Sequence, residues 1–303
     1  MFDQRPSRMH TVPQSYLEAF STQEPMRRTA AIWRFDRSSA EPKLVGVRDA
    51  EVVRDIYTVY AEDGSPDTGI EDEIFVDIEG AFCTARQNLR NHRRVTPDDW
   101  RSLTVFVSAQ LLRTPRMLQG MRELMDKIGV CYQQDTAPRV MLELLRRCAH
   151  RVARMRGTIG FNETEFPFLT CDNPAVMWKS LGDQVLTGVN QFDPSMVVSC
   201  PLAPDLMFIA SQTPESLSVA AAVFDGDAPN TFSVHVDVGS VPQFEVKRLN
   251  RICTANAHRY VYANYNDKRL GRFLHNNFFG RPGPRPRQDL IALGTPLSDL
   301  LER

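Results

Sequence analysis

The most constraining feature of the sequence is a change in the spacing of its apolar residues near residue 157. Between Glu71 and Met155, apolar residues recur at the three- and four-residue spacing of amphipathic helices. After Gly157 the chain breaks into short apolar or alternating runs separated by Pro, Asn, Asp and Gly, which is typical of strands and turns. We therefore expect a helical block over about residues 71–156 and a sheet-rich part over about 157–264.

Helix starts inside the block are marked by two Thr-Pro pairs. Each pair, at residues 96–97 and 114–115, places an N-cap hydroxyl before a proline at the first helical position. The pairs predict helices over about 96–113 and 114–128, and the apolar spacing predicts another over about 138–155.

The N-terminal part contains a predicted hairpin. Residues 31–37 alternate apolar and charged side chains as a strand does, and a second strand near 44–47 can pair with it. Residues 49–57 are expected to form a short helix. Because the hairpin needs a sheet to join, we expect one intermixed α+β domain over residues 1–279, followed by a Pro/Arg-rich tail over 280–303. Its mixed or mostly antiparallel sheet would combine this hairpin with the C-terminal half and pack against the helical block.

Composition places the chain among ordinary globular proteins and excludes several classes. Hydrophobic residues make up 42% and charged residues 24%, and the net charge of -1 gives no general attraction to nucleic acid or anionic membranes. The six cysteines form no C-x-x-C pair, which argues against a zinc site or a disulfide framework and fits a reducing cytosol. No apolar run reaches about 18 residues. We expect a cytoplasmic protein without a membrane partner.

Common catalytic signatures are missing from the sequence. There is no G-x-x-x-x-G-K-[ST], G-x-G-x-x-G, G-x-S-x-G or H-E-x-x-H, so phosphate-loop, Rossmann, α/β-hydrolase and zincin functions are unsupported. The basic residues are nearly all arginine, which reflects either codon usage or phosphate recognition. The arginine-rich stretch over residues 146–156 can hold phosphates or can be a solvated helix without aromatic side chains for base stacking.

The segment with the most specified residue order runs from His10 to Phe20. His10 can act as a base, an acid or a metal ligand, because an imidazole titrates near neutral pH. Gln14 follows four residues later, so the two side chains share a helix face if the helix begins early. In the alternative interpretation His10 packs against the helix that Pro13 starts, and Gln14 is solvated.

Two further candidates lie on the helical block. Glu79 borders the buried stripe that passes through Ile78, and Gly80 beside it leaves room for the carboxylate to face a cleft. It can equally be part of a solvated helix face, as can Asp77. Arg113 ends one helix just before the next and can bind a carboxylate or phosphate with both arms, or complement the dipole of its own helix.

The Asp172-Asn173-Pro174 segment is the most site-like stretch of the C-terminal half. It follows an apolar strand, where an acid and an amide are well placed to bind a metal or to accept a proton. The same residues also make ordinary turns, with Asp172 hydrogen-bonding to the backbone ahead of it.

The run from His10 to Phe20, followed by Trp33 to Arg37, resembles a bacterial family of domains of unknown function, DUF4238, whose members commonly begin His-x-Val-Pro-Gln-x-Tyr-Leu-x-x-Phe. The likeness continues in three short segments, Ile78-Glu79-Gly80, Arg113-Thr114-Pro115 and Asp172-Asn173-Pro174. Where the family often has a serine before Asp-Asn-Pro, this chain has Cys171. The resemblance implies a shared fold and carries no established activity.

The resemblance groups six polar residues, His10, Glu79 and Asp172 as catalytic candidates and Gln14, Arg113 and Asn173 as substrate-binding candidates. If they converge, Glu79 and Asp172 can also hold Mg²⁺ or Mn²⁺, and the arginine can offset negative charge. This hypothesis describes a hydrolase of a phosphodiester in nucleic acid or a nucleotide, acting as a bacterial defence or toxin-like effector. The alternative is a non-catalytic binding module for an anionic ligand, in which the His10 motif is architectural.

Overall fold

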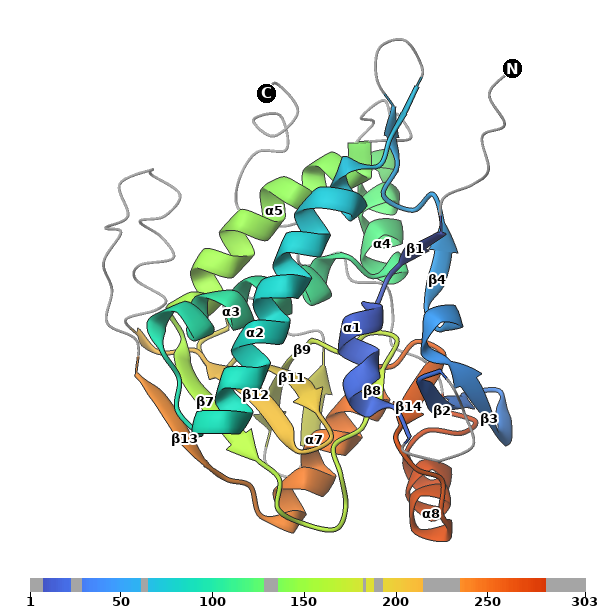
Figure 1. The fold of residues 1–303 in the computed structure, drawn as a ribbon, viewed down its shortest axis with the longest axis vertical. Helices are drawn as coiled ribbons and strands as arrows, with labels where there is room; N and C mark the ends of the chain where they lie inside the picture. Colours follow the sequence, from blue (N-terminus) through green and yellow to red (C-terminus); the bar gives the residue numbers. More distant parts are fainter. Residues whose placement is uncertain are drawn as a thin grey trace.

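The computed structural model describes residues 8–22, 29–60, 65–127, 136–181, 184–187, 193–214 and 235–281. Helices and mostly antiparallel sheets form an α+β fold, which confirms the predicted class (Figure 1). The expected tail from residue 282 onwards lies outside the described residues. Within the described residues, no helix is both long and apolar enough to cross a membrane.

The larger sheet has six strands in the order β10-β9-β11-β12-β7-β13. Neighbouring strands are antiparallel except β13, which runs parallel to β7. The strands are β7 (Arg156–Phe161), β9 (Val176–Leu181), β10 (Gln184–Thr187), β11 (Val197–Ala203), β12 (Leu206–Ser211) and β13 (Val236–Ser240). All of them come from the part of the chain after residue 155, where the sequence predicts strands.

The smaller sheet joins the two ends of the chain. Its order is β3-β2-β14-β8, with all neighbours antiparallel. The strands are β2 (Ala31–Asp36), β3 (Ser39–Gly46), β8 (Thr170–Cys171) and β14 (Tyr260–Ala263). The predicted hairpin is therefore present, and the two strands that complete its sheet, β14 and β8, come from the C-terminal half.

The prediction of a helix over residues 49–57 is wrong. A short 3-10 turn (Val47–Asp49) is followed by strand β4 (Val52–Arg54), which pairs with β1 (Arg8–His10). Val52 and Val53 are β-branched and favour a strand once a partner is available. That partner is about forty residues away in the chain, so the local pattern did not indicate it. A second two-stranded sheet pairs β5 (Val59–Tyr60) with β6 (Pro66–Asp67).

The helical block begins with a π-helical turn, η3 (Ile70–Phe75), and continues as α2 (Val76–His92), α3 (Pro97–Leu112), α4 (Pro115–Lys127) and α5 (Thr136–Ala153). Both Thr-Pro pairs mark helix starts as predicted. At the first, the Thr96 hydroxyl accepts a hydrogen bond from the Asp99 N–H at 3.1 Å, and the Asp99 carboxylate accepts from the Thr96 N–H at 3.1 Å. This reciprocal capping fixes where α3 begins.

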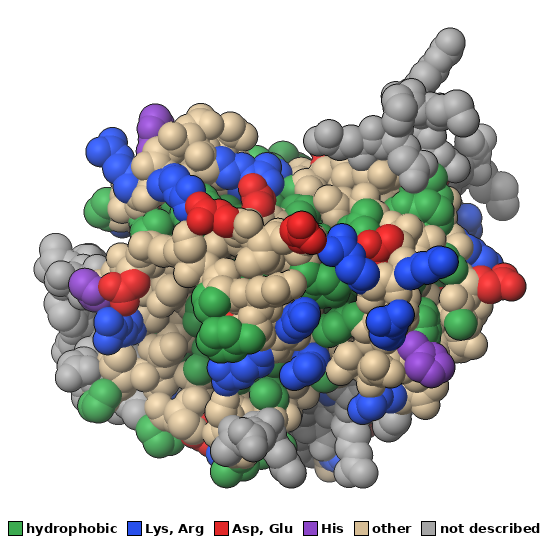
Figure 2. All heavy atoms as spheres, turned by 90° about the horizontal axis from the view of Figure 1, so that it is seen from below, with side chains coloured by type: hydrophobic (Ala, Val, Ile, Leu, Met, Phe, Trp, Pro, Cys, Tyr) green, Lys and Arg blue, Asp and Glu red, His purple; other side chains and the backbone are tan. Residues whose placement is uncertain are grey.

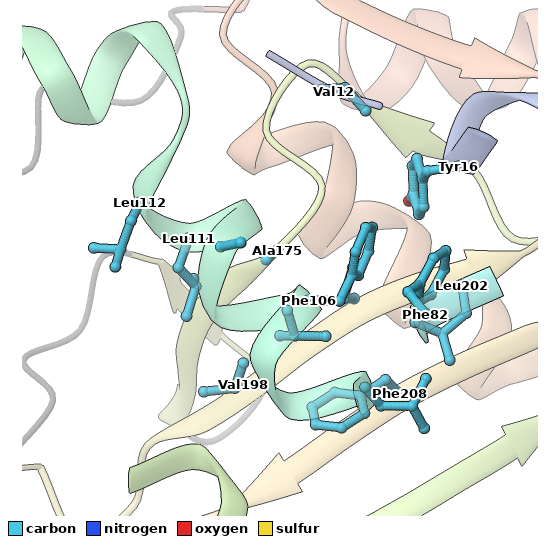
Figure 3. Close-up of a cluster of buried hydrophobic side chains, with 14 of the residues drawn as sticks. Val12, Tyr16, Phe82, Phe106, Leu111, Leu112, Ala175, Val198, Leu202 and Phe208 are labelled. Carbon is cyan, nitrogen blue, oxygen red and sulfur yellow. The ribbon is translucent and has the colours of Figure 1, made fainter. Parts of the chain in front are cut away.

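Helices cover both faces of the larger sheet. On one face α2, α3 and α5 pack over β7, β11 and β12, and the rings of Phe82 and Phe106 stack at 3.7 Å (Figure 3). On the other face α7 (Gln243–Asn256) and α8 (Lys268–Asn277) bury a second apolar cluster that also takes in the smaller sheet. Gly157 lies where the helical block meets β7, and a Cβ there would come within 2.5 Å of the Trp100 ring. Only glycine allows that approach.

Candidate functional site

Arg113 is the centre of the most concentrated polar cluster. Its side chain is completely buried at the end of α3. One arm donates to Glu79 Oε1 at 2.8 Å; the other donates to the carbonyl oxygen of His10 and lies 3.5 Å from Glu71 Oε2. The guanidinium also stacks 4.0 Å from the Phe75 ring centre. A buried charge needs partners of this kind, because an unpaired one is costly to remove from water. Of the nitrogens of this guanidinium, only Nε has no hydrogen-bond partner among the described residues.

The spacing of η3 and α2 places these partners on one side. Glu71, Phe75 and Glu79 are four residues apart, so they line one helix face toward Arg113. Sequence reasoning found Glu79 and missed Glu71, although the repeated four-residue spacing was a usable signal. The sequence left open whether Arg113 binds a ligand or complements its helix; in the structure it pairs with carboxylates of the same chain.

His10 joins the same cluster through its backbone. Its N–H donates to Glu71 Oε1 at 3.1 Å, and its carbonyl accepts from Arg113. The half-buried imidazole has Nδ1 at 3.2 Å from the Ala50 carbonyl oxygen. Because a carbonyl only accepts, Nδ1 carries the proton and Nε2 keeps its lone pair. Burial lowers the pKa of His10 below its ordinary 6.5, so the ring is neutral at pH 7.

The rest of the N-terminal motif points elsewhere. On α1 (Gln14–Leu17) the Gln14 amide donates to Glu18 at 2.9 Å in an exposed contact. The neighbouring Ser15 hydroxyl reaches Glu79 Oε2 at 3.4 Å instead. The buried Tyr16 hydroxyl donates to the Pro201 carbonyl at 2.6 Å and contacts the Thr170 hydroxyl at 2.7 Å. Tyr16 therefore ties α1 to both sheets.

Asp172 and Asn173 form a separate joint. Asp172 is buried and accepts three backbone N–H groups, those of His258 (2.7 Å), Arg259 (2.5 Å) and Tyr260 (2.8 Å). Asn173 exchanges side-chain-to-carbonyl hydrogen bonds with Asn256, which sequence reasoning did not select. The Asp-Asn-Pro turn thus fastens the end of α7 to the start of β14. Across the described segments, neither residue hydrogen-bonds to His10, Glu79 or Arg113.

Glu51 lies between the two groups and carried no sequence signal. Its carboxylate accepts from the Tyr262 hydroxyl and from the Thr11 hydroxyl at 3.3 Å. Its backbone has φ 55°, a left-handed conformation that is strained for a residue other than glycine and that is enriched at functional sites. Burial, together with the nearby charge of Asp172, raises the pKa of Glu51 to about 7. The positive charge of Arg34 opposes this rise in the pKa of Glu51.

The Trp33 to Arg37 segment has an architectural role. Arg37 donates to five backbone carbonyls where α7 and α8 end, at distances from 2.5 Å (Ala257) to 3.3 Å (Phe278). Asp36 pairs with Arg259 at 3.0 Å. A guanidinium at two helix C-termini satisfies carbonyls that have no partner within their helices.

The donor sets do not assemble a ready-made metal centre. Among the residues that the structure describes, no three His, Cys, Asp or Glu side chains lie together as a metal would require. Both oxygens of Asp172 already accept backbone hydrogen bonds, whereas the one hydrogen bond that Glu79 Oε2 accepts from a described residue is the long contact with Ser15. Of the two expected metal ligands, Glu79 therefore has the carboxylate oxygen that is less occupied by hydrogen bonds.

Both polar groups fall within a region that matches a known protein family. The family model described as a protein of unknown function (DUF4238) matches residues 8–267. The chain belongs to the DUF4238 family. No match was found among the curated proteins or among the solved structures. The DUF4238 match covers both sheets and the helical block, and ends just before α8.

In this DUF4238 member, three of the six expected site residues meet. His10, Glu79 and Arg113 come from β1, α2 and α3 and share hydrogen bonds. Asp172 and Asn173 lie together at a different joint, and Gln14 hydrogen-bonds to Glu18 in an exposed contact. What the first group offers chemically is a neutral, oriented imidazole beside a carboxylate that a buried arginine holds in place.

Proposed function

We propose that the protein is a hydrolase in which His10 is the acid–base residue. The observation that carries this proposal is the anchored imidazole, whose Nδ1 is fixed on the Ala50 carbonyl and whose Nε2 lone pair meets no described donor. A neutral, oriented imidazole can take a proton from water as water attacks a substrate. The lowered pKa of His10 keeps the ring in the basic form at neutral pH.

Glu79 is the partner that supports this chemistry. Its charge stabilises protonated His10, because a nearby carboxylate favours the imidazolium. About one fifth of its side chain is exposed, against 1% for Arg113. Arg113 is therefore a positioning residue in this proposal: it holds Glu79 and the His10 backbone and does not reach the substrate.

The substrate class we propose is a phosphodiester of nucleic acid or a nucleotide, as expected of a defence or toxin-like effector. Two carboxylates, Glu71 and Glu79, surround a single guanidinium, so an anionic substrate would meet excess negative charge. A divalent cation on Glu79 would offset that charge. Mg²⁺ commonly binds through one or two carboxylates, water and the substrate phosphate, so three protein ligands are not required. Mg²⁺ or Mn²⁺ dependence is therefore part of the proposal.

Hydrolysis of bis-p-nitrophenyl phosphate and of labelled oligonucleotides with Mg²⁺ or Mn²⁺ tests the proposal. His10→Ala is expected to lower kcat by about 10²–10⁴-fold, because general base catalysis is lost. His92→Ala, which changes an exposed histidine at the end of α2, is the matched control and should keep full activity. Equal activity in His10→Ala and wild type would rule out the mechanism.

A second candidate is a non-catalytic binding module for an anionic ligand with an architectural motif. The complete burial of Arg113 and the Tyr16 bridge between the sheets favour it. It expects His10→Ala to lower the melting temperature clearly, since the part-buried Ala50 carbonyl loses the hydrogen bond from the imidazole. It also expects no metal-dependent turnover in the wild type. The catalytic proposal expects turnover that His10→Ala abolishes while most stability is kept.

A further inference from the structure

The two C-terminal helices carry an uneven share of positive charge. Together α7 and α8 contain six lysine or arginine residues and one acid, Glu245. The whole chain has a formal net charge of only -1, so this excess is local. Local excess of one sign on neighbouring elements produces a field that attracts the opposite charge.

Four of the six cations have no ion pair within the described structure. Arg248 pairs with Glu245 at 3.1 Å, and Arg269 pairs with Glu165 at 2.9 Å and with Asp267 at 3.2 Å. The four that remain are all exposed, Lys247 and Arg251 on α7 and Lys268 and Arg272 on α8. Their charges are therefore available to a partner.

The four cations form two short rows. Each pair is four residues apart, which is about 6 Å along a helix and on the same face. The opposite faces of both helices are buried in the second apolar cluster, with Leu249 on α7 and Leu270 on α8. The rows therefore face solvent on the outer side of the molecule. In the view from below, Lys and Arg side chains gather over the centre and right of the surface with hydrophobic side chains between them (Figure 2).

An aromatic side chain extends the row on α7. Phe244 is 72% exposed, three residues before Lys247 and seven before Arg251, so all three share a helix face. Among the described residues, Phe244 is the most exposed of the large apolar side chains. Cations combined with an accessible ring are the pattern by which proteins hold single strands, with phosphates on the cations and a base on the ring.

We propose that this surface, defined by Phe244, Lys247, Arg251, Lys268 and Arg272, binds single-stranded nucleic acid. Charge complementarity supplies most of the affinity and makes it salt-dependent. The surface is built on α7 and α8, whereas His10 and Glu79 lie on β1 and α2. This proposal rests on the proposed hydrolase function in one respect, namely that the bound strand would also be the substrate of the His10 site.

The test is fluorescence anisotropy with a labelled single-stranded oligonucleotide over a range of salt concentrations. Changing Lys247, Arg251, Lys268 and Arg272 together to alanine should weaken binding at least about tenfold. It should also reduce the slope of log K against log salt concentration, by about 0.7 for each phosphate that no longer meets a cation. Phe244→Ala should weaken binding with an unchanged slope, because stacking is not a charge effect. The matched control replaces four exposed arginines elsewhere on the surface with alanine, Arg48, Arg54, Arg94 and Arg101.

Three results would overturn the proposal. The first is absence of binding by the wild type at low salt, and the second is an equal loss in the test and control variants, which would indicate net charge alone. The third is binding to vesicles of anionic lipid without binding to the oligonucleotide, which would make the surface membrane-facing. Hydrolysis of bis-p-nitrophenyl phosphate by the four-alanine variant is measured in parallel. Because this small substrate does not need the surface, its turnover reports on the His10 site separately from strand binding.

Discussion

At the scale of single residues, the structure separates side chains that serve a ligand from those that serve the fold. The family motifs contribute strongly to the second group: Arg113, Asp172 and Arg37 each hydrogen-bond to atoms of the same chain. The sequence alone left both roles open for Arg113 and Asp172, since an arginine or an acid two residues before a proline suits either. The deciding facts are burial and partner geometry, which depend on distant segments.

Replacing Arg113 by alanine should destabilise the protein by about 3–5 kcal/mol, because Glu71 and Glu79 would be left facing each other without a cation. Urea denaturation of the two proteins measures this difference. Arg101→Ala, an exposed position on the same helix, should change stability by less than about 0.5 kcal/mol. A loss at Arg113 no larger than at Arg101 would contradict the structural role.

Glu51 should make stability depend on pH. Its pKa in the folded protein is about 7, above the ordinary 4.5, so the folded state holds a proton that the unfolded state has released between these values. The resulting stabilisation is complete below pH 4.5 and is lost as the pH rises through 7.

Glu51→Gln keeps a neutral side chain at every pH. The wild type should therefore lose on the order of 1–3 kcal/mol relative to Glu51→Gln between pH 5 and pH 8. Denaturation midpoints at several pH values measure it, with the exposed Glu41→Gln as the control. Parallel curves for wild type and Glu51→Gln would show that Glu51 ionises normally.

At the scale of elements, local signals were sufficient for the helices and insufficient for β4. A capping threonine and a proline act within one turn, so α3 and α4 begin where the sequence places them. Strand β4 exists because β1 lies beside it, and no local pattern encodes that pairing. The same limit applies to the site: Glu79 was found from its own helix, whereas Glu51 depends on the register of two short strands.

A substitution of Tyr16 measures how strongly its hydroxyl fixes α1 between the two sheets. Tyr16→Phe leaves the Pro201 carbonyl and the Thr170 hydroxyl without that partner in a buried place, and should cost about 1–3 kcal/mol. Tyr265→Phe is the matched control, because the Tyr265 hydroxyl is buried and has no hydrogen-bond partner among the described residues. Thermal unfolding should show a clear loss for the first variant and little change or a gain for the second. Similar losses would mean that the Tyr16 bridge contributes nothing specific.

At the scale of the whole molecule, the fold class followed from the order of patterns along the chain, while the connection between its ends did not. The hairpin of β2 and β3 needed a sheet, and β14 supplies it from more than two hundred residues later. The six expected site residues were grouped by family resemblance, which does not specify distance. Three of them share a cluster and the others make structural contacts elsewhere. Members of one family share residues that hold the fold together as well as residues of the active site.

The position of Tyr16 has a consequence for how the chain is made. During synthesis α1 leaves the ribosome before the partners of Tyr16, which lie 154 and 185 residues later, and a four-residue helix is not stable alone. Its anchoring points, Thr170 and Pro201, emerge only after the entire helical block has been translated. Helix α1 must therefore remain undocked until the strands that hold it have been made. We expect its docking between the two sheets to be a late step in folding.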